Sequence, residues 1–466
     1  MLNALNPIDI IIIAVFLAFQ LYYGSTGRRR PGDKPGAIDY LLASRRLTLP
    51  AFVMTLVSTW YGGVLGVGEY SYKYGISNWL VFGVPYYLWA AVFALFLARR
   101  ARRTQFISLP DHLAQSYGKA PAITAGLIVF VMTVPSAYVL QLGILMQFLW
   151  NWPLWWGVAL GAVLSVGYIL IGGFRADVQT NKLQFLAMFA GFALFLPFAL
   201  SKLGGWTYLT SSLPPEYFTW HGGNSGWYIL SWYFIAMDTL IDPAFYQRCY
   251  AAETEKVARR GILWSIPLWI VFDFLTTTAG LYARASVSNL PDAQMSYPAL
   301  AFKILPPGVM GLFFIGMLAT VMSTINSFTF LAAIAMARDV VCRLKPATDK
   351  AVIRATRWGL LAAMGLSIIL ALGEKSVIAL WRDLGSIGTP ALLLPVLATF
   401  LKKPVTSSAR MAMLWIAVPG MISAACVTWH AFFGKYPLDV EPIFPGLAAS
   451  VGIGVVLWTK RTGIAS

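Results

Sequence analysis

Residues 56–68 read Leu56-Val57-Ser58-Thr59-Trp60-Tyr61-Gly62-Gly63-Val64-Leu65-Gly66-Val67-Gly68. The stretch lies inside an apolar segment long enough to span a membrane, yet its last seven residues include four glycines. Each glycine inside a helix costs about 1 kcal/mol relative to alanine, and in lipid the freed backbone groups need partners within the protein or in a wet cavity. Two interpretations follow: a helix interrupted to form a binding site, or helices that pack closely through small residues.

The composition is that of a polytopic membrane protein. Of the 466 residues, 58% are hydrophobic and 12% are charged, against about 25% charged in soluble domains. The three cysteines and three histidines are scattered, so the sequence predicts neither disulfides nor a metal site built on these residues. Basic loops on one side of a membrane explain the net charge of +16 better than binding of nucleic acid does.

Apolar segments of spanning length follow one another along the whole chain. They lie near residues 8–26, 46–75, 78–100, 121–149, 152–172, 180–203, 226–246, 262–285, 308–341, 352–373, 376–401, 409–432 and 442–459. The first segment lacks a preceding basic region and a cleavage site, so we expect a retained helix rather than a signal peptide. The prediction is an all-α polytopic membrane protein with about 13 transmembrane helices.

The distribution of basic residues predicts the orientation in the membrane. One set of alternate loops holds most of the lysines and arginines, including Arg28, Arg29, Arg30 and Lys34 in the first loop. The opposite set holds Lys202, Arg284, Lys303, Lys375 and Lys435. Because basic loops stay in the cytoplasm, the N-terminus should lie outside the cell membrane and the C-terminus in the cytoplasm.

Hydroxyl groups line one face of the ninth segment. Thr320, Ser323, Thr324 and Ser327 recur at three- and four-residue spacing, which places them on one side of a helix. Hydroxyl and carbonyl oxygens are hard ligands, and a site with few carboxylates suits a monovalent cation rather than calcium. The alternative is hydrogen bonding between helices, which contributes only about 0.6 kcal/mol per pair.

The seventh segment contains a second candidate interruption. Asp238 and Asp242 are four residues apart, and Pro243 favours a break directly before it. An aspartate at mid-bilayer costs about 2.5–3.5 kcal/mol, so Asp238 is a candidate functional group. Asp242 has an alternative role near the cytoplasmic end as the ion-pair partner of Arg248, and Asp273 in the eighth segment is a weaker candidate of the same kind.

The two interrupted segments lie five helices apart. Five is odd, so the sets 46–203 and 226–401 have opposite orientations, as in an inverted-topology repeat. The two breaks would then flank one central cavity. On this interpretation residues 1–45 add an extra N-terminal helix and a cytoplasmic loop, and residues 402–466 add two C-terminal helices to a single transport domain.

Four stretches resemble motifs of the sodium:solute symporter family. They are Gly172 to Gln184, which follows the pattern GG-x-x-A-x-x-x-TD-x-x-Q, Gln247 to Ala252, Asp39 to Leu47, and the helix from Ser323 to Asp339. The resemblance implies a leucine-transporter-like fold with discontinuous helices and sodium as the coupling ion. It places the sodium ligands at the carbonyls of Leu56, Thr59 and Thr320 and at the hydroxyls of Ser323 and Thr324. Asn181 replaces the aspartate of the pattern, which favours one sodium rather than two.

The central cavity is expected to bind a small organic solute. Its predicted lining is Ser58, Trp60, Gly63, Tyr87, Trp89, Gln141, Asp238 and Trp381. A carboxylate among aromatic rings favours a solute with an amine or quaternary ammonium group. The alternative is that these rings face lipid or only pack against other side chains.

The predicted function is therefore sodium-coupled symport of a small solute across a lipid bilayer, without catalysis. Sodium-dependent sugar or carboxylate symport, a proton-coupled or uncoupled transporter and a transporter-like sensor are the alternatives. An enzyme is disfavoured, because the sequence contains no Asp-rich diphosphate motif, paired histidines or Ser–His–Asp set of plausible depth.

Overall fold

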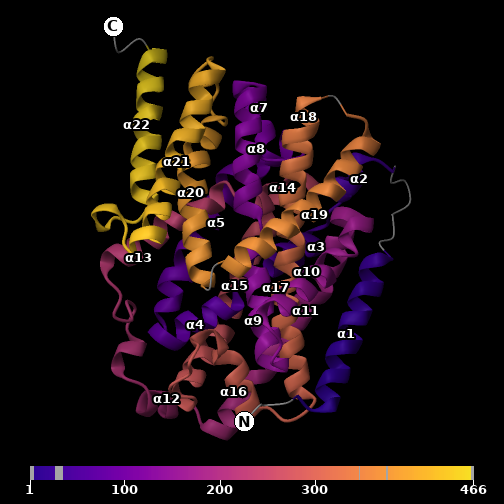
Figure 1. Ribbon diagram of the computed structural model, residues 1–466, viewed down its shortest axis with the longest axis vertical. Helices are drawn as coiled ribbons and strands as arrows, with labels where there is room; N and C mark the ends of the chain where they lie inside the picture. Colours follow the sequence, from indigo (N-terminus) through magenta and orange to yellow (C-terminus); the bar gives the residue numbers. More distant parts are fainter. Residues whose placement is uncertain (1–4, 27–34, 346, 374–375, 463–466) are drawn as a thin grey trace.

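The structure is a computed structural model that describes residues 5–26, 35–345, 347–373 and 376–462. Within these ranges the chain is a bundle of helices without a β-strand, and an isolated β-bridge joins Leu47 to Ala252 (Figure 1). This architecture confirms the predicted all-α fold. Outside the described ranges lie five basic residues used to predict the orientation: Arg28, Arg29, Arg30, Lys34 and Lys375.

The helices follow one another with short connections, and η denotes short 3-10 or π-helical segments. The first half contains α1 (Pro7–Ser25), α2 (Ala37–Leu42), η1 (Ala43–Arg45), α3 (Leu49–Trp60), α4 (Val64–Tyr74), η2 (Trp79–Gly83), α5 (Val84–Val92), η3 (Phe93–Leu97), α6 (Ala98–Arg103), α7 (Pro110–Tyr117), α8 (Lys119–Thr133), α9 (Ser136–Trp150), α10 (Leu154–Val166) and α11 (Ile169–Leu203). The second half contains α12 (Trp206–Ser212), η4 (Pro215–Phe218), α13 (Gly226–Ile235), η5 (Ala236–Leu240), α14 (Pro243–Ala251), α15 (Glu255–Ser286), η6 (Ala293–Met295), α16 (Ser296–Ile304), α17 (Val309–Ile334), η7 (Ala335–Val341), α18 (Cys342–Leu344), α19 (Asp349–Gly373), α20 (Val377–Ala398), α21 (Ala409–Phe433), η8 (Pro437–Asp439) and α22 (Ile443–Thr462).

The helix lengths agree with a multi-pass membrane protein. Ten stretches of the described chain are long and apolar enough to cross a membrane, and the pair α3 and α4, bent by 57°, adds an eleventh. The two remaining predicted segments correspond to α10, which has 13 residues, and to the interrupted set α13, η5 and α14. Each predicted segment therefore has a helical counterpart at the same place in the chain.

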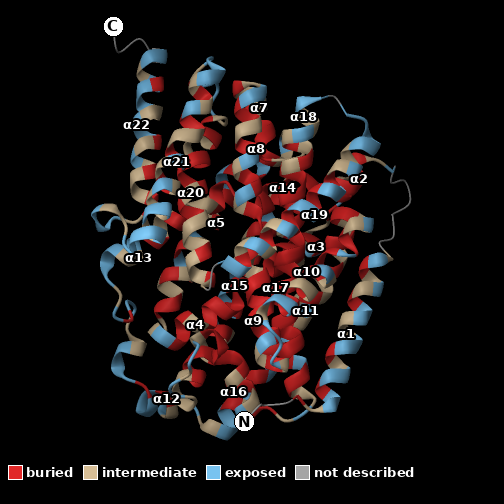
Figure 2. Cartoon of the chain, viewed as in Figure 1, coloured by how far each residue is buried: buried red, intermediate tan, exposed pale blue. Residues whose placement is uncertain are grey.

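Helix α17 forms the centre of the bundle. Of its apolar window 89% is buried, against 61% or less for every other described span, and the buried residues concentrate around it in Figure 2. Helix α11 packs closely against α17, because a Cβ on Gly191 would lie only 2.9 Å from the Cα of Gly316. The hydroxyl face predicted on this segment therefore points into protein rather than into lipid.

Helix α1 is fixed to the start of α17 by a buried carboxylate. Asp9 Oδ1 accepts hydrogen bonds from the backbone N–H groups of Gly308 and Gly311, each at 2.7 Å. The first N–H groups of a helix have no partner within it, so Asp9 supplies acceptors that α17 lacks at this end. The first apolar segment is thus an integral helix of the bundle.

The stretch from Gly172 to Gln184 lies within α11. The predicted spans 152–172 and 180–203 left residues 173–179 between them, but the chain is helical from Ile169 to Leu203, with a kink at Gly173. Gly173 has φ of +58°, and a Cβ there would lie 2.4 Å from the carbonyl oxygen of Tyr40. Glycine is therefore needed for both the backbone conformation and the close approach to α2.

Candidate functional site

The chain at the first broken helix makes close contacts that only glycine permits. Helix α3 ends at Trp60 and α4 begins at Val64. A Cβ on Gly62 would lie 2.1 Å from Thr324 Oγ1, and a Cβ on Gly63 would lie 1.7 Å from the ring of Trp381. The glycines therefore bring the break against α17 and α20, so both readings of the stretch, interruption and close packing, apply here.

The buried side chain of Gln141 supplies a partner for the backbone at this break. Its Oε1 accepts a hydrogen bond of 2.9 Å from the N–H of Leu65, in the first turn of α4. This N–H is one of the groups that an interruption leaves without a helical acceptor. Gln141 was predicted to contact solute, and in the structure its Oε1 bonds to the backbone of this break.

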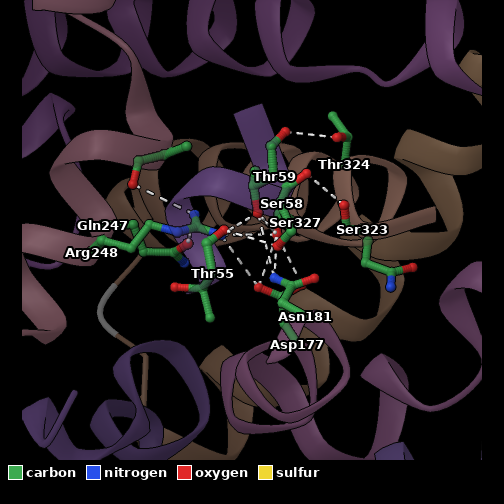
Figure 3. A network of polar contacts seen from close by, with 12 residues as sticks. Thr55, Ser58, Thr59, Asp177, Asn181, Gln247, Arg248, Ser323, Thr324 and Ser327 are labelled. Atoms are coloured by element: carbon green, nitrogen blue, oxygen red, sulfur yellow. Dashed lines mark hydrogen bonds and ion pairs between the residues drawn. The ribbon is translucent and has the colours of Figure 1, made fainter. Parts of the chain in front are cut away.

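Backbone and hydroxyl oxygens of α3 and α17 meet directly next to the break. Ser323 Oγ donates to the carbonyl of Ser58 and Thr324 Oγ1 donates to the carbonyl of Thr59, each at 2.6 Å (Figure 3). Ser323 Oγ also lies 2.9 Å from the carbonyl of Thr320. Leu56 is fully buried on α3, three residues before Thr59. The five predicted sodium ligands thus belong to two helix segments in contact, and their oxygens are uncharged.

The second broken helix carries carboxylates instead of glycines. Segment η5 contains Asp238, and Asp242 is the N-cap of α14, where its Oδ1 accepts hydrogen bonds from the N–H groups of Ala244 at 2.6 Å and Phe245 at 3.2 Å. Asp242 was alternatively expected to pair with Arg248, and in the structure the ion pair of Arg248 is with Asp177, at 3.6 Å. Asp238 Oδ1 is buried and has no hydrogen-bond partner among the described residues.

A central cavity lies between the two breaks. Its empty volume is about 1230 Å³, including the space at its opening. Five of the predicted solute-contacting residues line it: Trp60, Gly63, Tyr87, Asp238 and Trp381. Ser58 does not, since its hydroxyl donates back to the carbonyl of Met54 at 2.9 Å. Trp89 also lies elsewhere, with its Nε1 donating to the carbonyl of Tyr233 at 3.1 Å.

The charged residues in the described cavity lining are all acidic. Asp238, Asp242 and Asp273 line the cavity, and the described lining contains no lysine, arginine or histidine. Asp273 already has two donors, because its carboxylate accepts hydrogen bonds from the hydroxyls of Tyr61 and Tyr87. Asp238 Oδ1 has no partner among the described residues, and the hydrogen bonds to Asp242 use only its Oδ1, so these two carboxylates each have an oxygen available for a ligand. Asp273 was predicted only as a weak candidate, and its tyrosine partners could not be inferred from spacing along the chain.

Aromatic rings make up much of the remaining wall. The ring of Trp60 lies 5.6 Å from that of Tyr86 and 6.0 Å from that of Trp269, two other residues of the lining. The other aromatic residues of the lining are Tyr61, Phe82, Tyr87, Tyr138, Phe328 and Trp381. Ring faces attract cations, so the wall and the carboxylates favour the same sign of ligand charge.

A buried arginine lies next to the α3–α17 contact. Arg248 of α14 is fully buried, and its Nη2 donates to Thr59 Oγ1 at 2.7 Å and to Ser327 Oγ at 2.9 Å (Figure 3). The same nitrogen lies 3.6 Å from a carboxylate oxygen of Asp177, which is also fully buried. Asn181 Nδ2 donates to Ser327 Oγ at 3.1 Å. The sequence placed Arg248 only near the cytoplasmic end and gave Asp177 no role, although an aspartate next to a spanning segment was a usable signal.

The short helix α7 supports the second broken helix from outside the spanning segments. The ring of His112 lies 5.6 Å from that of Tyr246 and 6.2 Å from that of Tyr250, both on α14. Burial lowers the pKa of His112 to about 4, although the neighbouring Asp111 acts in the opposite direction. The imidazole is therefore neutral at physiological pH.

Comparisons with known proteins identify relatives that match over most of this chain. The sodium:solute symporter family matches residues 40–416. The sodium/pantothenate symporter of Escherichia coli is 25% identical over 89% of this chain and 88% of its own length. The high-affinity choline transporter 1 of Drosophila melanogaster is 24% identical over 81% of this chain and 64% of its own length. The structure of a sodium-coupled sialic acid symporter, in a substrate-bound outward-open state, superposes with a TM-score of 0.79 at 16% identity and covers 99% of this chain and 98% of that one.

Proposed function

The chain belongs to the sodium:solute symporter family, and we propose that it imports a small amine- or ammonium-bearing solute together with sodium. Family membership supports sodium-coupled symport by a multi-pass membrane protein. The observation that carries the choice of solute is the cavity lining, with three aspartates, no basic side chain among its described residues and an unpartnered oxygen on Asp238. A buried charge is costly unless it is paired, and a cationic solute would provide the pair.

Other solute classes fit this cavity less well. A carboxylate solute would bring a second negative charge beside the aspartates without a basic partner. A neutral sugar would hydrogen-bond to Asp238 but would leave its charge uncompensated. Among the relatives, one name specifies pantothenate and another specifies choline, a quaternary ammonium compound. The cavity chemistry favours the second kind of solute.

Sodium is proposed to bind between α3 and α17. Its ligands would be the carbonyls of Leu56, Thr59 and Thr320 and the hydroxyls of Ser323 and Thr324. Two of these hydroxyls now donate to α3 carbonyls, and rotation of each O–H would direct an oxygen lone pair toward the ion. Uncharged oxygen ligands suit a hard monovalent ion.

Binding of sodium and binding of solute would be coupled because the proposed ion site and the cavity contain adjacent residues of the chain. Thr59 belongs to the proposed ion site, and Trp60, the next residue, lines the cavity. Sodium would hold α3 against α17 and favour the outward-open state, and solute would then favour occlusion and inward release. In this proposal the repeats 46–203 and 226–401 move against each other in the cell membrane, with the N-terminus outside and the C-terminus in the cytoplasm.

The test is a thermal-shift screen of a small-solute library with the purified protein, in sodium and in potassium. An amine or ammonium compound that stabilises the protein only in sodium would support the proposal. Stabilisation by carboxylates or sugars would contradict the choice of solute. Hits that are independent of sodium would contradict the ion site and favour proton-coupled or uncoupled transport.

A further inference from the structure

A concentration of basic residues lies where two neighbouring helices meet. Helix α6 and residues 253–260, which include the first turns of α15, contain seven lysines and arginines against two glutamates. The two helices are in contact, because the guanidinium of Arg103 on α6 donates hydrogen bonds of 2.8 and 3.1 Å to the carboxylate of Glu255 on α15. This ion pair uses one of the two glutamates, so most of the basic charge remains to be balanced.

Other arginines of the described chain are balanced by carboxylates. Arg338 and Arg343 both lie within ion-pair distance of Asp111 and Asp339. In contrast, four exposed residues of α6 and α15 form no ion pair among the described residues. They make up what we call the basic patch: Arg99, Arg100, Lys256 and Arg260.

The exposed face of each helix changes from basic to apolar within one or two turns. Phe96, three and four residues before the two arginines of the patch, is 62% exposed on the same side of its helix. On α15, Trp264 is 60% exposed and lies four residues after Arg260. Both helices belong to spans that are apolar and long enough to cross a membrane, one ending at Arg103 and the other beginning at Glu255. The basic patch therefore lies at a membrane boundary, beside side chains that face lipid.

We propose that the basic patch binds the headgroup of an anionic phospholipid whose acyl chains lie along Phe96 and Trp264. The phosphate supplies the negative charge that the patch lacks, and lysines and arginines at a membrane boundary attract anionic lipids. Aromatic side chains such as Trp264 are enriched at this depth. A soluble anion would contact the basic side chains alone, whereas a phospholipid also covers the apolar surface. The proposal is independent of the solute and the ion assigned above.

This lipid site adjoins the end of the second broken helix. Arg102 of α6 donates from Nε to the carbonyl of Ala252, the C-cap of α14, at 2.5 Å. Helix α6 thus contacts both α14 and the start of α15. A lipid that bridges α6 and α15 stabilises the packing around this end of α14, so its binding should raise the melting temperature of the protein.

The test is a titration of the purified full-length protein with phosphatidylglycerol in detergent micelles, followed by the melting temperature. Phosphatidylglycerol should stabilise the protein in a saturable manner. Phosphatidylcholine, which has acyl chains but no net charge, should not. Glycerol 1-phosphate, which has the anionic phosphate but no acyl chains, should not stabilise it either.

Two double variants with the same loss of charge locate the site. Arg99→Gln with Arg100→Gln should raise the half-saturating concentration of phosphatidylglycerol by about tenfold or more, because two cations next to the lipid phosphate are lost. Lys402→Gln with Lys403→Gln removes two exposed cations from a turn elsewhere in the chain and should leave it unchanged. Phe96→Ala retains every charge and should also raise the half-saturating concentration, because it removes apolar contact with the acyl chains.

Equal losses in the two double variants would indicate diffuse attraction to negative charge and would overturn the inference. Equal stabilisation by phosphatidylcholine, or stabilisation by glycerol 1-phosphate alone, would also overturn it. If the arginine variant does not fold, Lys256→Gln with Arg260→Gln tests the same patch from α15. If that variant also fails to fold, native mass spectrometry of the wild type decides: preferential retention of phosphatidylglycerol supports the inference, and equal retention of phosphatidylcholine refutes it.

Discussion

The two broken helices are interrupted by different kinds of residues. The α3/α4 break uses Gly62 and Gly63, and its neighbours present uncharged oxygens from α3 and α17. The η5/α14 break uses Asp238, Asp242 and Pro243, and it presents carboxylates to the cavity. In the proposed function the two breaks therefore bind different ligands. Neutral oxygens at the α3/α4 break bind a small ion, and a carboxylate at the η5/α14 break binds a larger, organic cation.

The largest expected effect is on solute affinity, and it should differ between two carboxylates of the same cavity. Asp238→Asn should lower the affinity for the cationic solute by about a hundredfold or more, because loss of one partner of a buried ion pair costs about 3–5 kcal/mol. Asp273→Asn should lower it by less than about tenfold, since tyrosine hydroxyls already occupy that carboxylate. Equilibrium binding of a solute identified in the screen measures both, and equal losses would contradict the assignment to Asp238.

Acidic pH should destabilise the packing of His112 on α14, next to the second break. His112 packs on α14 with a pKa lowered to about 4, below its ordinary value of 6.5. The unfolded chain therefore takes up this proton first, so the stability from His112 is complete above pH 6.5 and decreases as the pH falls toward 4. The loss should be about 2 kcal/mol by pH 5. The melting temperature against pH tests this, and His112→Phe should flatten the curve between pH 6.5 and 5; an unchanged slope would exclude His112 as the cause.

Gly62→Ala should disturb the first break. The new Cβ would lie 2.1 Å from Thr324 Oγ1 and would force α3 away from α17. Overpacking of this kind costs about 1–3 kcal/mol, and we expect sodium affinity to fall by about tenfold or more. Gly365→Ala on α19 is the matched control, because nothing lies within 4 Å of its Cβ position. Sodium-dependent thermal stabilisation measures the effect, and equal behaviour of the two variants would contradict the close contact at Gly62.

The smallest effect concerns a single oxygen of the ion site. Ser323→Ala should lower sodium affinity by about tenfold, because a hydrogen bond or ligand contact to a charged group contributes about 1.5–3 kcal/mol. Thr329→Ala on the same helix removes a hydroxyl that, among the described residues, bonds to the carbonyl of Ile325 in its own helix, and it should leave sodium affinity unchanged. A larger loss in Thr329→Ala than in Ser323→Ala would place the ion elsewhere.

Much of this arrangement could be predicted from the sequence because periodicity and glycine or proline positions act locally. The spans, both interruptions and the hydroxyl face of α17 follow from residues close together in the chain. The network around Arg248 could not be predicted in this way, because Asp177, Arg248 and Ser327 come from three distant helices. The sequence also placed Arg248 near the cytoplasmic end, whereas an ion pair with Asp177 keeps this arginine inside the bundle.

The most direct test of the account is reciprocal binding of sodium and an ammonium-bearing solute, measured by calorimetry on the wild type and on Asp238→Asn. Sodium should raise the solute affinity of the wild type, and solute should raise its sodium affinity by the same factor. In Asp238→Asn sodium should still bind, and solute should lose its effect on sodium affinity. Unchanged solute binding by Asp238→Asn, or solute binding of the wild type that is indifferent to sodium, would contradict the division between the two breaks.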